Sequence, residues 1–301
     1  MKNLLLLLLF LPFSLMAQTN LKLQKGEKYY QNTSNTIALQ QTINGQEMNI
    51  NIDNESKTSF LLEDVKGDNY TFRVTFEKLI LGLEMGPQIQ TFTSIDGVDP
   101  LSKFLNLLTQ HHFVIVMSDK GKLLEVRDMD KLWAEIEKEP LEIPAMQKMQ
   151  MINQLKQSYG QEQLKSNLEL MFGIYPAKEV EGKQKWVINS TLKGGITADL
   201  SRTFMITETN DETVVLKEES ILSTDPEKKD FNEVNGVPTR FEGEGTMNST
   251  FTLDKTTGWV NNALIKLNVK GKSIVQMQGQ EMTIPMVMKS ITEVKNNEKI
   301  K

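Results

Sequence analysis

An alternation of apolar and polar residues early in the chain predicts a β-hairpin. Residues 36–43 and 46–53 both alternate, and Asn44-Gly45 between them favours the positive φ angles of a two-residue type I′ turn. Such a turn pairs Ile43 with Gln46, and the pattern then places apolar residues together on one face, as a half-buried antiparallel pair requires. The further predicted pairs are Gln41 with Met48, Leu39 with Ile50, and Ile37 with Ile52.

More strands and one short helix follow in the first half of the chain. Residues 57–65 and 70–79 flank a turn at 66–69, and residues 113–118 and 122–126 flank Asp119-Lys120-Gly121. Between these pairs, Asp99-Pro100 predicts a helix start, because aspartate caps helices and proline suits the first turn. The expected apolar stripe of this helix is Leu101, Phe104, Leu105 and Leu108.

The middle of the chain, residues 128–172, has helical character. It is rich in Glu, Lys, Gln, Met and Leu, and its apolar residues recur at helical spacing, which is typical of packing positions. We expect two or three helices here, ending near Gly173 and Pro176. The apolar residues at this spacing are Leu132, Trp133, Met146, Met149, Leu155, Leu164, Leu168, Met171 and Phe172.

The second half of the chain returns to strands. The predicted strands cover residues 185–191, 198–208, 213–222, 239–253, 259–269 and 273–294. Turns are expected at Thr257-Gly258 and Lys270-Gly271 among others, and residues 254–259 form a tight connection between two long strands.

One short stretch recurs near the two ends of the chain. Residues 44–50 read NGQEMNI and residues 278–284 read QGQEMTI, each at a turn between long alternating segments. The simpler interpretation is that similar hairpins reuse similar turn chemistry. The alternative is that the two terminal hairpins occupy related places in one closing sheet.

These patterns predict an α+β fold. We expect a large, curved, half-barrel-like antiparallel β-sheet with the central helical segment packed on its concave face. The expected organisation is a signal peptide at 1–17, a β-rich region with one short helix at 18–127, a helical segment at 128–176 and an antiparallel β region at 177–301. We expect 18–301 to be one continuous domain; two β lobes joined by the helices are the alternative.

The first residues predict export from the cytoplasm. Lys2 precedes an unbroken apolar run over residues 4–11, and Pro12 and the small Ala17 follow it, which is the pattern of a cleavable secretory signal peptide. The run is too short to span a bilayer, which takes about 20 apolar residues. We expect cleavage between Ala17 and Gln18, no transmembrane segment afterwards, and a soluble periplasmic or extracellular protein.

Charge and composition narrow the function classes. The formal net charge is −5, which disfavours nucleic acid as a partner, because phosphates demand clustered Lys and Arg. Cysteine is absent, so no disulfide, thiolate nucleophile, thiolate metal site or lipid-anchoring thiol is available.

The sequence offers few candidate catalytic or metal-binding residues. The two histidines, His111 and His112, are adjacent, and neighbours on a strand point to opposite faces, so we predict no shared metal or catalytic site there. Glu242 and Glu244 are expected on one face of a strand, and such pairs of carboxylates are common on solvated sheet faces. The 16 methionines suit adaptable apolar surfaces better than a copper site. We predict no catalytic residue, metal or cofactor, and hence no enzyme.

The sequence resembles an exported Bacteroidota family of unknown function. The resemblance rests on the leader ending Met16-Ala17-Gln18, the run at 36–46, the hairpin and helix start at 113–132, and residues 254–259 before long paired strands. It covers most of the chain after the leader and implies no catalytic residues. At the level of fold, long antiparallel strands around a few helices are similar to the half-barrel of periplasmic lipoprotein carriers, which implies a site for an acyl chain between sheet and helices.

We therefore expect a non-enzymatic protein that binds a lipid or another hydrophobic small molecule between sheet and helices. The alternative is a cell-envelope interaction or assembly protein, with an envelope protein as partner, acting through an exposed sheet face or strand edge. The expected ligand-binding residues are Met146, Met149, Leu155, Leu164, Leu168, Met171 and Phe172.

Overall fold

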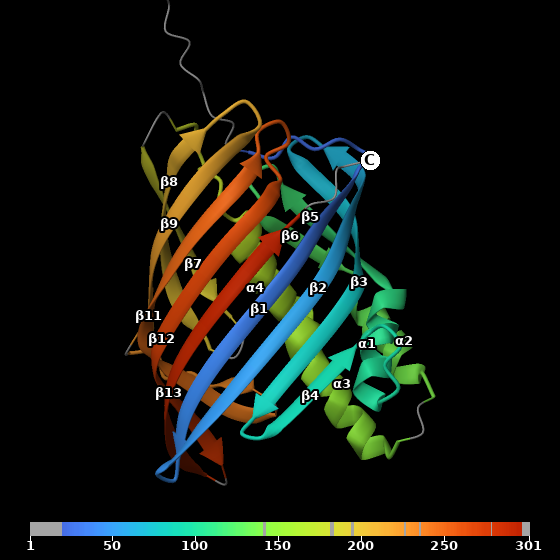
Figure 1. The fold of residues 1–301 in the computed structure, drawn as a ribbon, viewed down its shortest axis with the longest axis vertical. Coiled ribbons are helices and arrows are strands. Elements are labelled where there is room, and N and C mark those ends of the chain that lie inside the picture. Colours follow the sequence, from blue (N-terminus) through green and yellow to red (C-terminus); the bar gives the residue numbers. More distant parts are fainter. Residues whose placement is uncertain are drawn as a thin grey trace, which may run out of the picture.

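Long antiparallel strands form most of the molecule (Figure 1). The computed structural model describes residues 20–140, 143–180, 184–193, 196–225, 227–234, 236–277 and 279–296, so the predicted leader at 1–17 lies outside the described residues. The strands are β1 (Lys28–Ile43), β2 (Gln46–Lys66), β3 (Asn69–Met85), β4 (Gln88–Thr93), β5 (His112–Ser118), β6 (Leu123–Arg127), β7 (Lys185–Leu192), β8 (Ala198–Thr209), β9 (Thr213–Ser223), β10 (Asn232–Val234), β11 (Val237–Asp254), β12 (Val260–Met277) and β13 (Gln280–Lys295). The helices are α1 (Pro100–Gln110), α2 (Met129–Lys138), α3 (Ala145–Tyr159) and α4 (Gln161–Phe172).

The strands belong to one 13-stranded sheet within the described residues. Its order is β6-β5-β3-β2-β1-β13-β12-β11-β9-β8-β7, with β4 beside β3 and β10 beside β11. The first and last strands pair from Thr33 with Val294 to Gln41 with Met286, which joins the two halves of the chain. The predicted curved antiparallel sheet with few helices is confirmed. The alternative of two separate β lobes is wrong, because this pairing makes the sheet continuous.

The first hairpin has the predicted register. Ile43 pairs with Gln46, Leu39 with Ile50 and Ile37 with Ile52. Asn44 and Gly45 have φ angles of 51° and 79°, as a type I′ turn requires. Since β1 lies beside β13, this hairpin neighbours the hairpin between β12 and β13 at the same end of the sheet (Figure 1). The two similar stretches noted in the sequence therefore occupy neighbouring places in one sheet.

The predicted turn at Lys270-Gly271 is wrong. β12 continues through Gly271, which pairs with Gly243 on β11 and with Met286 on β13. A Cβ atom at Gly271 would lie 2.3 Å from the Glu242 carbonyl oxygen and 2.9 Å from the Phe241 ring. Glycine is needed here because the backbones and the Phe241 ring approach closely in mid-sheet, rather than because the chain turns.

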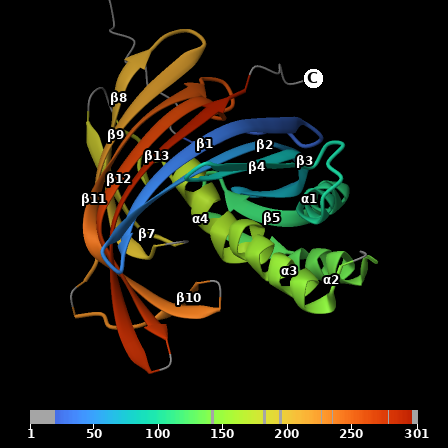
Figure 2. The same cartoon turned by 60° about the horizontal axis from the view of Figure 1, so that its bottom comes forward.

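Helices α3 and α4 lie on the concave side of the sheet, and α1 lies beside β3 (Figure 2). In α1, the Asp99 carboxylate caps the helix by accepting a hydrogen bond from the Ser102 amide at 2.9 Å, and all four residues of the predicted stripe are buried. α4 contacts the edge strand β6, and its carboxyl end contacts Arg202 of β8. This helix therefore contacts strands near both edges of the sheet.

An aromatic cluster marks the core beside the carboxyl end of α4. Trp259 lies 4.7 Å from Phe172, 4.9 Å from Tyr29 and 5.4 Å from Phe60, measured between ring centroids. The Tyr175 hydroxyl donates to the Gly258 carbonyl at 2.7 Å, which ties the segment after α4 to the turn before β12. This end of the concave side is thus filled by side chains, and the opposite end carries the two terminal hairpins.

Candidate functional site

The register assigns each strand residue to the concave or the convex face. Paired residues of an antiparallel ladder point to the same side, and Tyr29 and Phe60, which pair, are buried in the core. Every second residue from Tyr29 along β1 therefore points to the concave side, and the partners of these residues follow across the sheet. These concave positions are continuous over β3, β2, β1, β13, β12 and β11.

Toward the hairpin end, the concave positions are mostly apolar over several adjacent strands, and the polar exceptions are Gln41, Gln46, Ser273 and Gln280. We call this surface the apolar wall. It draws residues from four separate parts of the sequence, which the pairing of β1 with β13 and of β2 with β3 brings together. Its members are Ile37, Leu39, Ile43, Met48, Ile50, Ile52, Leu81, Leu83, Met85, Leu267, Val269, Val275, Met277, Met282, Ile284, Met286 and Met288.

The apolar wall is partly open to solvent. Most of its side chains are half-buried, and three at its rim, Met48, Met85 and Met277, are 41%, 42% and 53% exposed. In contrast, the concave residues nearest the aromatic cluster, such as Tyr29 and Phe60, are 1% exposed. Val269, Ile284 and Met286 are 2%, 8% and 6% exposed, so part of the wall is covered by the protein and part, toward the rim, is open to solvent.

Charged residues are excluded from the concave positions of the central strands. In the described parts of β2 from Gln46 to Phe60, of β1 from Tyr29 onward, and of β13, β12 and β11, no concave position holds Asp, Glu, Lys, Arg or His. The same strands carry many charges on the convex face. There, Glu242 accepts from Arg240 at 3.0 Å, Lys272 at 3.2 Å and Lys229 at 3.3 Å. The hydrogen bond from Lys272 is the main cause that lowers the pKa of the Glu242 carboxyl.

An uncharged polar belt separates the apolar wall from the aromatic core on the three central strands. Its members, all half-buried, are Thr33 and Asn35 on β1, Asn54 and Ser56 on β2, and Ser290 and Thr292 on β13. The Asn35 amide nitrogen donates to the hydroxyl oxygens of Ser290 at 2.9 Å and Thr292 at 2.6 Å. The concave face thus changes from core to neutral polar to apolar along each of these strands.

The residues predicted as ligand-binding from the sequence fall into two groups. Leu155, Leu164, Leu168, Met171 and Phe172 are buried in the hydrophobic core, from 0% to 8% exposed. Met146 and Met149 are 71% and 59% exposed on α3, so the expectation that they occupy packing positions is wrong. Contact of any of the seven with a ligand stays a prediction. The apolar wall was missed as a site, although the pairing of Ile37 with Ile52 and the shared face of Met282, Met286 and Met288 already indicated it.

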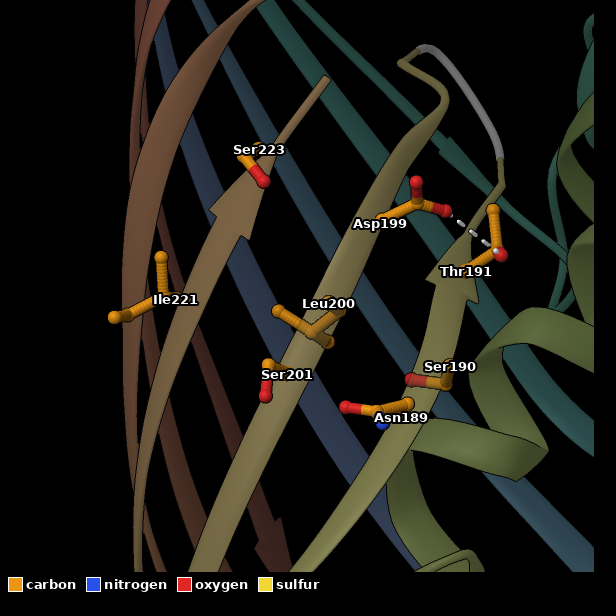
Figure 3. Close-up of a pocket in the computed structure, with 8 residues that line it drawn as sticks. All are labelled: Asn189, Ser190, Thr191, Asp199, Leu200, Ser201, Ile221 and Ser223. Atoms are coloured by element: carbon orange, nitrogen blue, oxygen red, sulfur yellow. Dashed lines mark hydrogen bonds between the residues drawn. The ribbon is translucent and has the colours of Figure 1, made fainter. Parts of the chain in front are cut away.

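Other candidate sites in the described residues are polar or isolated. An open hollow of about 420 Å³ on β7, β8 and β9 is lined mostly by residues with hydroxyl, amide or carboxylate side chains, and there Asp199 accepts from Thr191 at 3.4 Å (Figure 3). His111 ends α1 and His112 begins β5. Within the described ranges, no three His, Cys, Asp or Glu side chains come together in a way that would hold a metal ion. None of the described helices is both long and apolar enough to cross a membrane.

The fold and the uncharged concave positions of the central strands define the class of this protein, which is a large open antiparallel sheet with helices on its concave side. The chain belongs to a family of unknown function (DUF6263), whose model matches residues 67–260. A search of curated proteins finds no match.

Two solved structures can be compared with this chain. The first is lipovitellin, solved in work on "Lipid-protein interactions in lipovitellin"; it aligns with 93% of this chain at 11% identity and a TM-score of 0.50, which shows similarity of fold alone. This chain spans only 26% of the lipovitellin chain. The second, an outer membrane channel from Pseudomonas putida F1, is 5% identical over 91% of this chain and 97% of the channel, and its TM-score of 0.22 carries no argument.

Proposed function

We propose that this protein is exported and binds a lipid or another hydrophobic molecule on the apolar wall, without catalysing a reaction. The observation that carries the proposal is the uncharged, partly exposed apolar surface continuous over the central strands. The lipovitellin structure, which has a similar fold, was solved in work on lipid–protein interactions, and this supports a lipid as the ligand class. Export is supported by the predicted leader at 1–17.

The energetics favour a ligand with long hydrocarbon chains. Each methylene removed from water contributes about 0.8 kcal/mol, so about ten methylenes give on the order of 8 kcal/mol before the cost of association is subtracted. Along β1, the distance from Asn35 to Ile43 is about 26 Å at 3.3 Å per residue. A long acyl chain can therefore lie along one strand of the wall and contact its neighbours.

Two adjacent residues of β1 test the proposal. Ile37 is half-buried on the apolar wall, and Ala38 is exposed on the convex face, where it pairs with Lys289. We expect Ile37→Asp to weaken binding of the uncharged fluorescent probe N-phenyl-1-naphthylamine at least tenfold, because a carboxylate on the wall opposes an apolar ligand. Ala38→Asp should bind the probe as the unchanged protein does.

Circular dichroism and native mass spectrometry accompany the probe-binding test. Circular dichroism of both variants establishes that each is folded. The proposal fails if the folded unchanged protein does not bind the probe, or if the two variants bind it equally. Native mass spectrometry of the protein purified from its own cells, followed by organic extraction, should reveal a bound lipid. Recovery without lipid but with a stoichiometric envelope protein would favour the alternative of an assembly role.

A further inference from the structure

The methionines of this protein differ widely in their exposure to solvent, and exposure decides which thioethers an oxidant can reach. On the concave face, Met247 and Met286 are 1% and 6% exposed, so the protein covers them. Within the described ranges, the exposed methionines have between 41% and 71% of their surface open to solvent: Met48, Met85, Met146, Met149 and Met277.

Three of these exposed methionines form the rim of the apolar wall. Met85 and Met277 are the last residues of β3 and β12, and Met48 is the third residue of β2, so each lies close to a strand end. The other two, Met146 and Met149, lie on α3, outside the wall. The chain thus has two groups of accessible thioethers, and only one of them belongs to the surface proposed for the ligand.

Met85 is the open end of a continuous apolar row across the concave face. The register places one residue from each of five strands side by side, in the order Met85, Ile50, Leu39, Met288 and Val269. Exposure falls from 42% at Met85 to 2% at Val269, with half-buried side chains between them. The row therefore opens to solvent at its methionine end, where a soluble oxidant and the ligand surface meet.

Oxidation turns the methionine thioether into a polar group. Hydrogen peroxide transfers one oxygen atom to the sulfur: the S–O bond forms, the O–O bond breaks, the sulfur gives up two electrons, and the peroxide leaves as water. The sulfoxide carries no net charge, but its oxygen accepts hydrogen bonds from water. Covering that oxygen with hydrocarbon, without a donor in place of water, is unfavourable.

On the basis of the function proposed above, we propose that Met48, Met85 and Met277 are modification sites at which a peroxide lowers the affinity of the apolar wall for its ligand. Their sulfoxides place polar oxygens along the rim, beside the side chains that a hydrophobic ligand contacts. Oxidation of Met146 and Met149 does not have this effect, because these residues lie outside the wall.

Peptide mass spectrometry after limited treatment with hydrogen peroxide tests where the oxygen is added. Each rim methionine should gain one oxygen atom about ten times faster or more than Met247 and Met286, because the thioether must be accessible to react. Rim methionines that react as slowly as Met247 would overturn the assignment of these sites.

A matched pair of variants connects the modification to binding. The rim variant, Met48→Leu/Met85→Leu/Met277→Leu, replaces each thioether by an apolar side chain of similar volume, and the α3 variant, Met146→Leu/Met149→Leu, does the same outside the wall. Each protein is compared with itself before and after peroxide treatment, using N-phenyl-1-naphthylamine once the peroxide has been removed with catalase. The unchanged protein and the α3 variant should lose probe affinity by about fivefold or more, and the rim variant by less than about twofold.

The outcomes separate this inference from the proposed function. Probe affinity that survives oxidation in the unchanged protein, or an equal loss in the rim variant, would overturn the inference and leave the proposed function intact. Circular dichroism should show that the oxidised protein is folded, and a loss of affinity that comes only with unfolding would likewise overturn the inference. Failure of the untreated protein to bind the probe at all is the outcome that removes the proposed function itself.

Discussion

Arg202 and Glu218 form a buried ion pair on the concave face, at the carboxyl end of α4. The Arg202 Nε donates to the Glu218 Oε1 at 2.7 Å, and its two other nitrogens donate to the carbonyl oxygens of Glu169, Leu170 and Gly173. Glu218 also accepts from the Ser220 hydroxyl at 2.6 Å. The pair fixes α4 to β8 and β9, because the guanidinium satisfies the carbonyl groups that a helix leaves unpaired at its end.

Glu218→Gln should destabilise the protein strongly. The substitution leaves the Arg202 charge buried without its partner, which costs about 3–5 kcal/mol in the free energy of unfolding, measured by urea denaturation. The control is Glu162→Gln, which breaks the exposed pair with Lys193 and should cost less than about 1 kcal/mol. The double variant Arg202→Leu/Glu218→Leu should recover part of the loss; a loss below about 1 kcal/mol in Glu218→Gln would contradict this role.

Gly121→Ala should disrupt the contact between the β5–β6 turn and α4. Gly121 has a φ of 70°, and a Cβ there would lie 1.8 Å from the Phe172 carbonyl oxygen. Gly67→Ala is the matched control, since Gly67 has a φ of 58° and nothing within 4 Å of the Cβ. We expect the control to cost about 1 kcal/mol from backbone strain alone and Gly121→Ala clearly more, measured as urea unfolding free energies. Equal losses would show that the close approach does not matter.

The cap of α1 should make stability depend on acidic pH. Partial burial alone would raise the pKa of Asp99, but hydrogen bonds from Ser102 outweigh it and hold the pKa below the ordinary value of 3.8. Because the pKa of Asp99 is lowered in the folded state, the ionised cap contributes fully to the unfolding free energy above pH 3.8. This contribution is lost as the pH falls through the pKa of the folded state. Asp99→Asn caps without titrating, so the stability advantage of the unchanged protein over this variant should shrink between pH 6 and pH 3.

Asp99→Ala measures how much the same cap contributes to the unfolding free energy. At pH 6 it should lose about 1 kcal/mol of unfolding free energy, and the loss should be smaller at pH 3. An advantage over Asp99→Asn that is constant with pH would contradict the ionised cap.

Buried tyrosines should make the fold sensitive to alkaline pH. Burial raises the pKa of Tyr159 to about 12 and raises that of Tyr175 further, from an ordinary value of 10.0. Because the pKa is raised in the folded state, the neutral tyrosines contribute fully to the unfolding free energy below pH 10. This contribution is lost as pH rises, because the tyrosines of the unfolded chain ionise first.

Tyr175→Phe should distinguish the stability that the Tyr175 hydrogen bond provides from the stability that is lost when Tyr175 ionises. At pH 7 we expect a loss of about 1 kcal/mol, since the Gly258 carbonyl loses its donor. Between pH 9.5 and pH 11 the variant should lose less stability than the unchanged protein, by urea denaturation at each pH. Parallel curves for the two proteins would exclude Tyr175 from the alkaline loss.

Local patterns in the chain were enough to predict the individual hairpins and helices of this protein. Asn44-Gly45 with the alternation around it predicted the first hairpin and its register, and Asp99-Pro100 predicted the start of α1. These features depend on turn geometry, capping and side-chain periodicity, which act over a few residues. The fold class followed from the same patterns, because long alternating segments joined by short turns pair as antiparallel hairpins.

The tertiary structure decided which elements meet. Pairing of β1 with β13 unites Ile37 and Leu39 with Met286 and Met288 in one apolar wall, and alternation within a strand cannot specify a partner far away in the chain. Gly271 was misread as a turn because only the packed sheet shows the backbone of β11 and the Phe241 ring against it. The helical segment was expected to line the site, yet five of its residues pack in the core, since helical periodicity indicates a buried face without indicating whether protein or ligand covers it.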